Sequence, residues 1–166
     1  MPKDAAGCPA WLGRYATWHR QHRQDGPYLV YTCRPSMPGT NSHCLGFGDR
    51  FRLIAFMLRV AATFDRVLLI DWDSPAPLQH YLVPSTFDWR LRPAEAREFE
   101  GLHVERWLGG LPNGLPNPRP HVIRAVGNTP AFMPVGAGRS NQTARTDVDY
   151  ASFACMWRAL FRPSSR

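Results

Sequence analysis

The residues whose types and spacing best suit chemistry form the segment Gly46-Phe47-Gly48-Asp49-Arg50, which leads into a long apolar stretch. Its two glycines let the backbone approach a ligand closely and take positive φ where a turn needs it. A helix that starts here would present unpaired N–H groups and the positive end of its dipole to an anion, and Arg50 adds a positive charge. Together these features suit a phosphate or diphosphate group. The spacing matches neither the G-x-G-x-x-G fingerprint nor a P-loop, and a tight turn that simply needs glycine is the alternative.

Two strands and a helix are expected to position this segment. Residues Tyr28–Cys33 are rich in strand-forming types and predict a short buried strand. The stretch after Arg50 keeps its apolar residues on one helical face, and Arg66–Trp72 is a continuous apolar strand, typical of a parallel sheet covered on both sides. The order strand, loop, helix, strand defines a βαβ unit. Such a unit places residues 46–50 at the carboxyl edge of the sheet, where open α/β folds bind ligands.

The rest of the pattern completes one domain. The sequence predicts an α/β fold, a single Rossmann-like three-layer domain with a mostly parallel sheet over residues 26–164, after an N-terminal helical segment over residues 1–25. In that first helix (Pro9–Gln24), Trp11, Tyr15 and Trp18 share one apolar face. The other predicted elements are a helical turn at Pro77–Leu82, a loop at Pro84–Trp89 that returns to the sheet, a helix at Pro93–Leu108, a linker at Leu111–Pro120, a strand at His121–Val126 and a helix at Asp147–Phe161.

Composition narrows the function classes. The 166 residues include 20 Lys and Arg against 13 Asp and Glu, which gives a net charge of +7. The arginines are dispersed rather than clustered among aromatic residues, so we expect no nucleic-acid binding. The charge fits either a solvated surface or attraction to phosphate-bearing ligands. No cysteine or histidine spacing indicates a metal site, no run of about 20 apolar residues predicts a membrane segment, and the N-terminus lacks the apolar stretch of a signal peptide.

The four cysteines are Cys8, Cys33, Cys44 and Cys155. Cys33 and Cys44 bracket a loop rich in Pro, Gly, Ser and Asn, so a disulfide that pins this loop is expected in an oxidising compartment. Two buried free thiols are the alternative, and the sequence supports both equally.

Two longer motifs resemble a known family. The segment G-F-G-D-R, the apolar helix and R-V-L-L-I-D-W (Arg66–Trp72) resemble the N-terminal half of GT-B fucosyltransferases, the superfamily of plant xyloglucan, bacterial nodulation α-1,6- and protein O-fucosyltransferases. Divergent algal and protist members are the most similar, because there too a strand ending in Asp-Trp precedes a segment like Pro77–Trp89. The residues Leu160–Ser164 (L-F-R-P-S) resemble the segment before the second domain of those proteins. The resemblance spans about residues 26–164 and is strongest over 44–89 and 157–164.

The resemblance implies transfer of fucose from the donor GDP-fucose to a glycan or protein acceptor, with inversion and without a required metal, in a cleft between two Rossmann-like domains. In such enzymes the N-terminal domain mainly holds the acceptor, and its glycine loop lies near the phosphates and sugar of the donor. In this chain that loop is Gly46, Phe47, Gly48, Asp49 and Arg50. Asp49 could orient a hydroxyl or act as a base, and Arg50 could offset diphosphate charge, which leaves the catalytic base unassigned. The residues that could line an acceptor groove are Asp71, Trp72, Asp88 and Trp89, with a buried strand-end position as the other role for Trp72.

The chain also departs from the family pattern. The second domain of these enzymes, with its His-x-Arg motif for the GDP phosphates, has no counterpart in the 166 residues. The resemblance therefore implies a partial enzyme, weakly active or inactive by itself, whose full-length form would reside in the Golgi or secretory lumen. The alternatives are a non-catalytic carbohydrate- or anion-binding α/β domain and a phosphate-handling α/β protein unrelated to fucose.

Overall fold

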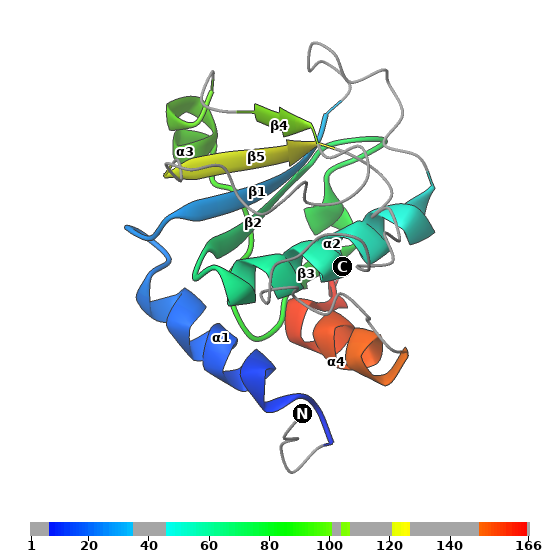
Figure 1. The fold of residues 1–166 in the computed structure, drawn as a ribbon. Coiled ribbons are helices and arrows are strands. Elements are labelled where there is room, and N and C mark those ends of the chain that lie inside the picture. The colour runs from blue at the N-terminus through cyan, green and yellow to red at the C-terminus, as the bar shows by residue number, and fades with distance from the viewer. Residues whose placement is uncertain (1–6, 35–45, 101–103, 107–120, 127–149, 166) are drawn as a thin grey trace, which may run out of the picture.

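The computed structural model describes residues 7–34, 46–100, 104–106, 121–126 and 150–165 (Figure 1). The helices are α1 (Ala10–Gln21), α2 (Phe47–Thr63), α3 (Pro93–Glu98) and α4 (Tyr150–Leu160), with a 3-10 turn η1 (Leu78–His80). The strands are β1 (Tyr28–Cys33), β2 (Val67–Trp72), β3 (Leu82–Pro84), β4 (Val104–Arg106), β5 (Val122–Val126) and β6 (Phe161–Pro163).

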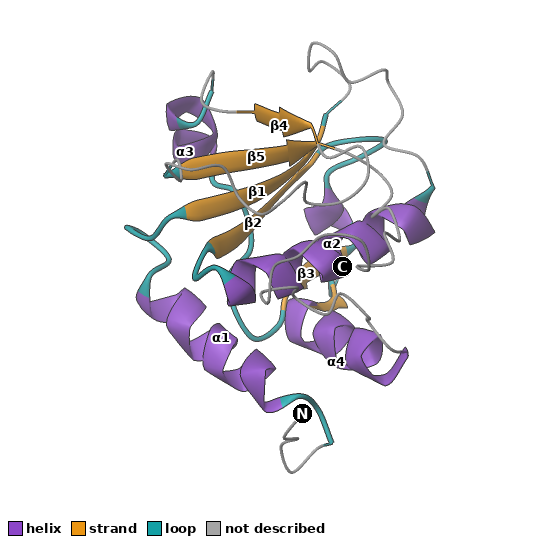
Figure 2. Ribbon diagram, in the orientation of Figure 1, coloured by secondary structure: helices purple, strands orange, loops and turns teal. Residues whose placement is uncertain are grey.

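Four of these strands form a parallel sheet in the order β2-β1-β5-β4 (Figure 2). The pairings of β1 with β2, β1 with β5 and β4 with β5 are all parallel. Thr32 of β1 lies opposite both Asp71 of β2 and Val126 of β5. Every residue of β1 and β2 is buried, as expected for strands covered on both faces. The predicted α/β fold with a mostly parallel sheet is therefore confirmed.

The main hydrophobic core lies on the face of the sheet that α1, α2 and α4 cover; Figure 1 shows these three helices gathered on one side. Alternate strand residues point to this face, among them Leu29, Tyr31, Leu68 and Ile70. Helix α2 is buried over most of its circumference, through Arg50, Leu53, Ile54, Ala55, Phe56, Met57, Leu58, Val60 and Ala61. A helix buried in this way lies between the sheet and other helices, and α2 contacts β1, β2, α1 and α4.

The opposite face of the sheet carries a smaller apolar cluster of Tyr28, Val30, Val67, Leu69, Phe99 and Val122. Phe99 directly follows α3, and its ring centroid lies 4.9 Å from that of Tyr28. Helix α3 begins with Pro93, and the Glu95 carboxylate accepts a 2.8 Å hydrogen bond from the backbone N–H of Arg92, which fixes the start of the helix. Helical elements therefore cover both faces and make a three-layer domain.

Strand β2 is an edge strand of the sheet, and its outer side is covered by α1 and by the segment around Trp89. The Tyr15 hydroxyl accepts from the Leu68 N–H and donates to the Arg66 carbonyl, both at 3.0 Å. His19 Nε2 donates to the Leu68 carbonyl at 3.0 Å. Beyond them, the Trp89 carbonyl accepts from the Ile70 N–H at 2.7 Å. Backbone groups that an edge strand would expose are thus paired, and α1 belongs to the same core as the rest of the domain.

The sequence-based prediction is wrong in two places. The helix predicted over Pro93–Leu108 ends at Glu98, and Val104–Arg106 is a strand, because pairing with β5 overrides the helical pattern. The last helix ends at Leu160, where β6 pairs antiparallel with β3, and neither three-residue strand was predicted. In α1, the predicted apolar residues Trp11, Tyr15 and Trp18 all pack against the main core; the tryptophans are half-buried, and the fully buried residues are Leu12, Tyr15, Ala16 and His19. The predicted linker Leu111–Pro120 lies outside the described residues.

Candidate functional site

Helix α2 begins beside the carboxyl end of β2. The Phe47 ring stacks on the Trp72 ring with centroids 5.6 Å apart, which joins the first helical residue to the last residue of the strand. The Asp73 N–H donates to the Cys33 carbonyl at 3.1 Å, so β1 and β2 end at the same level. The segment predicted to do chemistry therefore lies at the carboxyl edge of the parallel sheet.

The first turn of α2 is open. Gly46 is the N-cap residue with φ −64° and ψ 154°, and as a glycine it supplies no side-chain cap to the helix. Gly46, Phe47 and Gly48 are exposed, and a Cβ built on either glycine would meet nothing within 4 Å. Neither glycine has positive φ, so neither is required by the backbone conformation. The N–H groups of the first turn have no partner within the helix, and such groups together with the helix dipole suit an anion.

Arg50 lies beneath this turn and is only 7% exposed. Its guanidinium carbon lies 4.7 Å from the Trp72 ring centroid and 5.4 Å from the Phe47 centroid, and Nη1 donates to the Ser74 carbonyl. Burial lowers the pKa of Arg50. The guanidinium thus connects the start of α2 to the loop after β2. Its positive charge adds to that of the N-terminal end of the helix dipole.

Asp49 is the third helical residue and is half-buried. A carboxylate in the first turn is stabilised by the helix dipole, so Asp49 suits the start of α2 without any catalytic role. It lies on the same turn as the open N–H groups, which would place it near a bound anion.

The structure does not bring the four expected acceptor-groove residues together. Trp72 is 3% exposed and Trp89 is fully buried, with Nε1 donating to the Leu160 carbonyl at 2.6 Å, so neither indole face is open to a sugar. Asp88 forms an ion pair with Arg90, and its carbonyl accepts a hydrogen bond from Arg23. Arg23 precedes β1, so Asp88 lies toward the amino edge of the sheet, away from Asp71 and Trp72. Both tryptophans belong to the main hydrophobic core.

Asp71 and Trp72 are consecutive residues of β2, and consecutive strand residues point to opposite faces of a sheet. The Asp71 side chain therefore lies on the face away from the Trp72 ring. There its Oδ1 accepts from Arg34 Nε and its Oδ2 accepts from Arg124 Nη2, both at 2.7 Å. Arg124 Nε also donates to Thr32 Oγ1 at 3.3 Å. Sequence reasoning identified neither of the two arginine partners of Asp71, although an aspartate near the end of an apolar strand in an arginine-rich chain signals a need for one.

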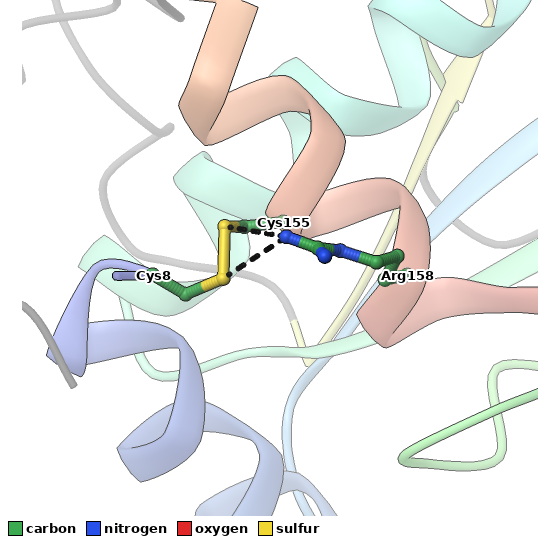
Figure 3. Close-up of a disulfide and its surroundings, with 3 residues drawn as sticks. All are labelled: Cys8, Cys155 and Arg158. Atoms are coloured by element: carbon green, nitrogen blue, oxygen red, sulfur yellow. Dashed lines mark hydrogen bonds between the residues drawn. A yellow bond between two sulfur atoms is a disulfide. The ribbon is translucent and has the colours of Figure 1, made fainter. Parts of the chain in front are cut away.

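Cys8, just before α1, forms a disulfide with Cys155 of α4, with Cα atoms 5.7 Å apart (Figure 3). Arg158 Nη2 lies 3.6 Å from the sulfur of Cys8 and 3.5 Å from that of Cys155. This bond was not predicted, because nothing in the sequence relates two cysteines that far apart. Cys33 is also disulfide-bonded; Cys44, its expected partner, lies outside the described residues, so that pairing stays a prediction.

Among residues 7–34, 46–100, 104–106, 121–126 and 150–165, no group of three His, Cys, Asp or Glu side chains is placed to hold a metal ion. Within the same ranges, no helix has the length and apolar character to cross a bilayer. Comparison with known protein families, with curated proteins and with solved structures found no match to this chain.

Proposed function

We propose that this chain is the acceptor-side α/β domain of a fucosyltransferase-like glycosyltransferase, in which the first turn of α2 faces the diphosphate of GDP-fucose. The observation that carries the proposal is the open, uncapped start of α2 at the carboxyl edge of a parallel sheet, on the very residues that resemble the family motif. The acceptor in this proposal is a glycan or a protein side chain.

The contacts of the first turn support a role for each residue. The N–H groups of Phe47 and Gly48 would donate to phosphate oxygens, and the buried Arg50 would add charge without occupying the site. The Phe47 ring, 50% exposed, would give the sugar an apolar surface to stack on. Asp71 and Asp88 are both engaged in ion pairs, which makes Asp49 the better candidate to orient the acceptor hydroxyl.

The cysteines support the compartment implied by this proposal. The Cys8–Cys155 disulfide and the disulfide-bonded Cys33 are typical of proteins that fold in an oxidising lumen. Transfer in the proposed mechanism needs no metal ion, so activity should survive chelation with EDTA.

The test removes the anion site without weakening the fold. A serine at position 46 would cap α2 by accepting from the N–H of Gly48 or Asp49, where it would compete with the diphosphate, and the extended backbone of Gly46 already suits an N-cap serine. We therefore expect Gly46→Ser to raise the melting temperature slightly and to weaken GDP binding about fivefold, which corresponds to about 1 kcal/mol. Binding is measured by backbone amide NMR shifts during titration with GDP.

Gly46→Ala is the matched control, because it adds the same Cβ without a capping oxygen; it should keep the affinity for GDP and lose some stability. Titration with guanosine, which lacks the diphosphate, should leave the amides of Phe47 and Gly48 unshifted. The donor site on this domain consists of few contacts, so we expect an affinity in the millimolar range, about −4 kcal/mol. Equal GDP binding by the serine and alanine variants would contradict the proposal.

A binding domain without chemistry is the second candidate, favoured by the ion pairs that already engage Asp71 and Asp88. The two candidates differ in turnover of the donor. Release of fucose from GDP-fucose, or its transfer to an acceptor glycan, by the full-length protein favours the enzyme. Diphosphate-dependent amide shifts without any turnover favour the binding domain.

A further inference from the structure

A second cationic cluster lies on the face of the sheet opposite α2 and comprises Thr32, Arg34, Asp71 and Arg124. Its residues come from β1, from the position just after β1, from β2 and from β5. Arg124 crosses β1 to donate to Thr32 Oγ1 at 3.3 Å and to reach Asp71 Oδ2 at 2.7 Å. Arg34 Nε donates to the other carboxylate oxygen at 2.7 Å. One aspartate thus holds two guanidinium groups at the carboxyl end of three adjacent strands.

The charges in this cluster do not balance. Asp71 and Arg124 have side chains that are each 6% exposed, and that of Arg34 is 37% exposed. Within the described part of the chain, Asp71 is the one carboxylate that forms an ion pair with either arginine. The described cluster therefore carries one excess positive charge, and its partly exposed member is Arg34. Because Asp71 and Arg124 are buried and already paired, the excess charge is available to an anion at the exposed part of Arg34.

The geometry of Arg34 suits that anion. Its Nε is used by Asp71, and neither Nη atom forms a hydrogen bond to a described residue. These two nitrogens are the half of the guanidinium fork that binds a phosphate or carboxylate group through parallel hydrogen bonds. Because Asp71 holds Nε and Arg124 holds Asp71, the fork is oriented before any ligand arrives. Such preorganisation reduces the entropy that binding must overcome.

We propose that Arg34, positioned by Asp71 and Arg124, is an oxyanion receptor that binds the phosphate or carboxylate group of a small ligand. This site does not depend on the fucosyltransferase proposal, since it uses other residues on the other face of β1. Arg34 contacts the anion, while Asp71 and Arg124 act as positioning residues.

The test compares melting temperatures in sodium phosphate, sodium acetate and sodium chloride at equal ionic strength. We expect phosphate to stabilise the wild-type protein more than chloride does. Arg34→Gln should weaken phosphate binding about tenfold and reduce that difference to the part that comes from phosphate as a kosmotropic salt and from other sites, while Asp71 keeps its bond to Arg124 and the fold is retained. Arg34→Lys keeps the charge but loses the fork and should bind with intermediate affinity. Arg97→Gln, an exposed arginine on α3, removes the same charge elsewhere and should behave as wild type.

A more direct readout is the NMR signal of the Arg34 Nε–H group, which should shift during titration with inorganic phosphate and should not shift with chloride. A similar shift with acetate would identify a general oxyanion site, and a shift with phosphate alone would identify a phosphate site. The inference is overturned if phosphate stabilises the wild-type, Arg34→Gln and Arg97→Gln proteins equally. That result would leave the α2 proposal intact, because Gly46→Ser tests donors on the other face.

Discussion

The Cys8–Cys155 disulfide should be the largest single covalent contribution to stability that the described residues reveal. It joins positions 147 residues apart and fixes the start of α1 to α4, two helices that cover the same face of the sheet. Closing a loop of this length in the unfolded chain stabilises the folded state by about 5 kcal/mol in the chain-entropy model. We therefore expect Cys8→Ala/Cys155→Ala to lower the free energy of unfolding by up to about that amount.

The assay is urea unfolding under non-reducing conditions, followed by tryptophan fluorescence. Replacing both cysteines avoids a lone thiol that could mispair, and it leaves Cys33 unchanged. A peptide map of the non-reduced wild-type protein should contain one cross-linked peptide pair that joins Cys8 to Cys155. The reasoning is refuted if the double variant unfolds within about 1 kcal/mol of wild type, since the cross-link would then constrain little of the unfolded chain.

Two further predictions concern buried polar groups. Burial lowers the pKa of His19 to about 4, so the unfolded chain binds a proton that the folded state does not, and stability should fall by about 3 kcal/mol as pH drops from 6.5 to 4. In urea titrations at both pH values, His19→Gln should reduce this loss of stability at low pH, whereas His80→Gln, at an exposed site, should leave it unchanged. An equal loss of stability in the two variants would contradict the prediction. Arg50→Gln should cost about 1–3 kcal/mol, because the contacts with Trp72 and Ser74 are lost. An unchanged urea midpoint would show that Arg50 does not hold the start of α2.

The centre of the fold was predictable from sequence because its elements are long and regular. The strands β1, β2 and β5 are short, mostly apolar segments, and α2 has a helical apolar pattern over 17 residues. The prediction failed at the periphery of the fold, where pairing between distant segments determines whether a segment forms a strand. Val104–Arg106 follows a helical sequence pattern, yet it pairs with β5. The β3–β6 pair, three residues on each strand, is too short to leave a periodic signal.

Helix α1 illustrates a different kind of failure. Its hydrophobic pattern identified Tyr15 correctly, but it could not identify His19 as buried. That histidine is buried because its Nε2–H satisfies a carbonyl at the edge of β2. A polar residue is buried here because it pairs with a backbone carbonyl of a strand that is distant in the sequence. No local sequence pattern reveals such a partner. The same reason explains why the Cys8–Cys155 bond was missed.

The candidate site was located by sequence, but the roles of its residues were only partly foreseen. The segment 46–50 was placed at the carboxyl edge from the order of elements alone. Its glycines were expected to allow close approach of a ligand and positive φ where needed; neither has positive φ, and a Cβ on either would meet no described atom within 4 Å. Trp89 was expected to line an acceptor groove, where its ring would stack on a sugar, and its complete burial could not be read from the local sequence.

The dipeptide Asp71-Trp72 takes on a new meaning in this structure. Consecutive strand residues point to opposite faces, so the end of β2 presents an indole to one side of the sheet and a carboxylate to the other. The indole supports the guanidinium of Arg50 beneath α2, and the carboxylate holds the guanidinium of Arg34. One strand end thus orients an arginine on each face of the same sheet edge. These two residues act as a scaffold for the flanking cations, and an anion that approaches the carboxyl edge meets positive charge on both sides of β1.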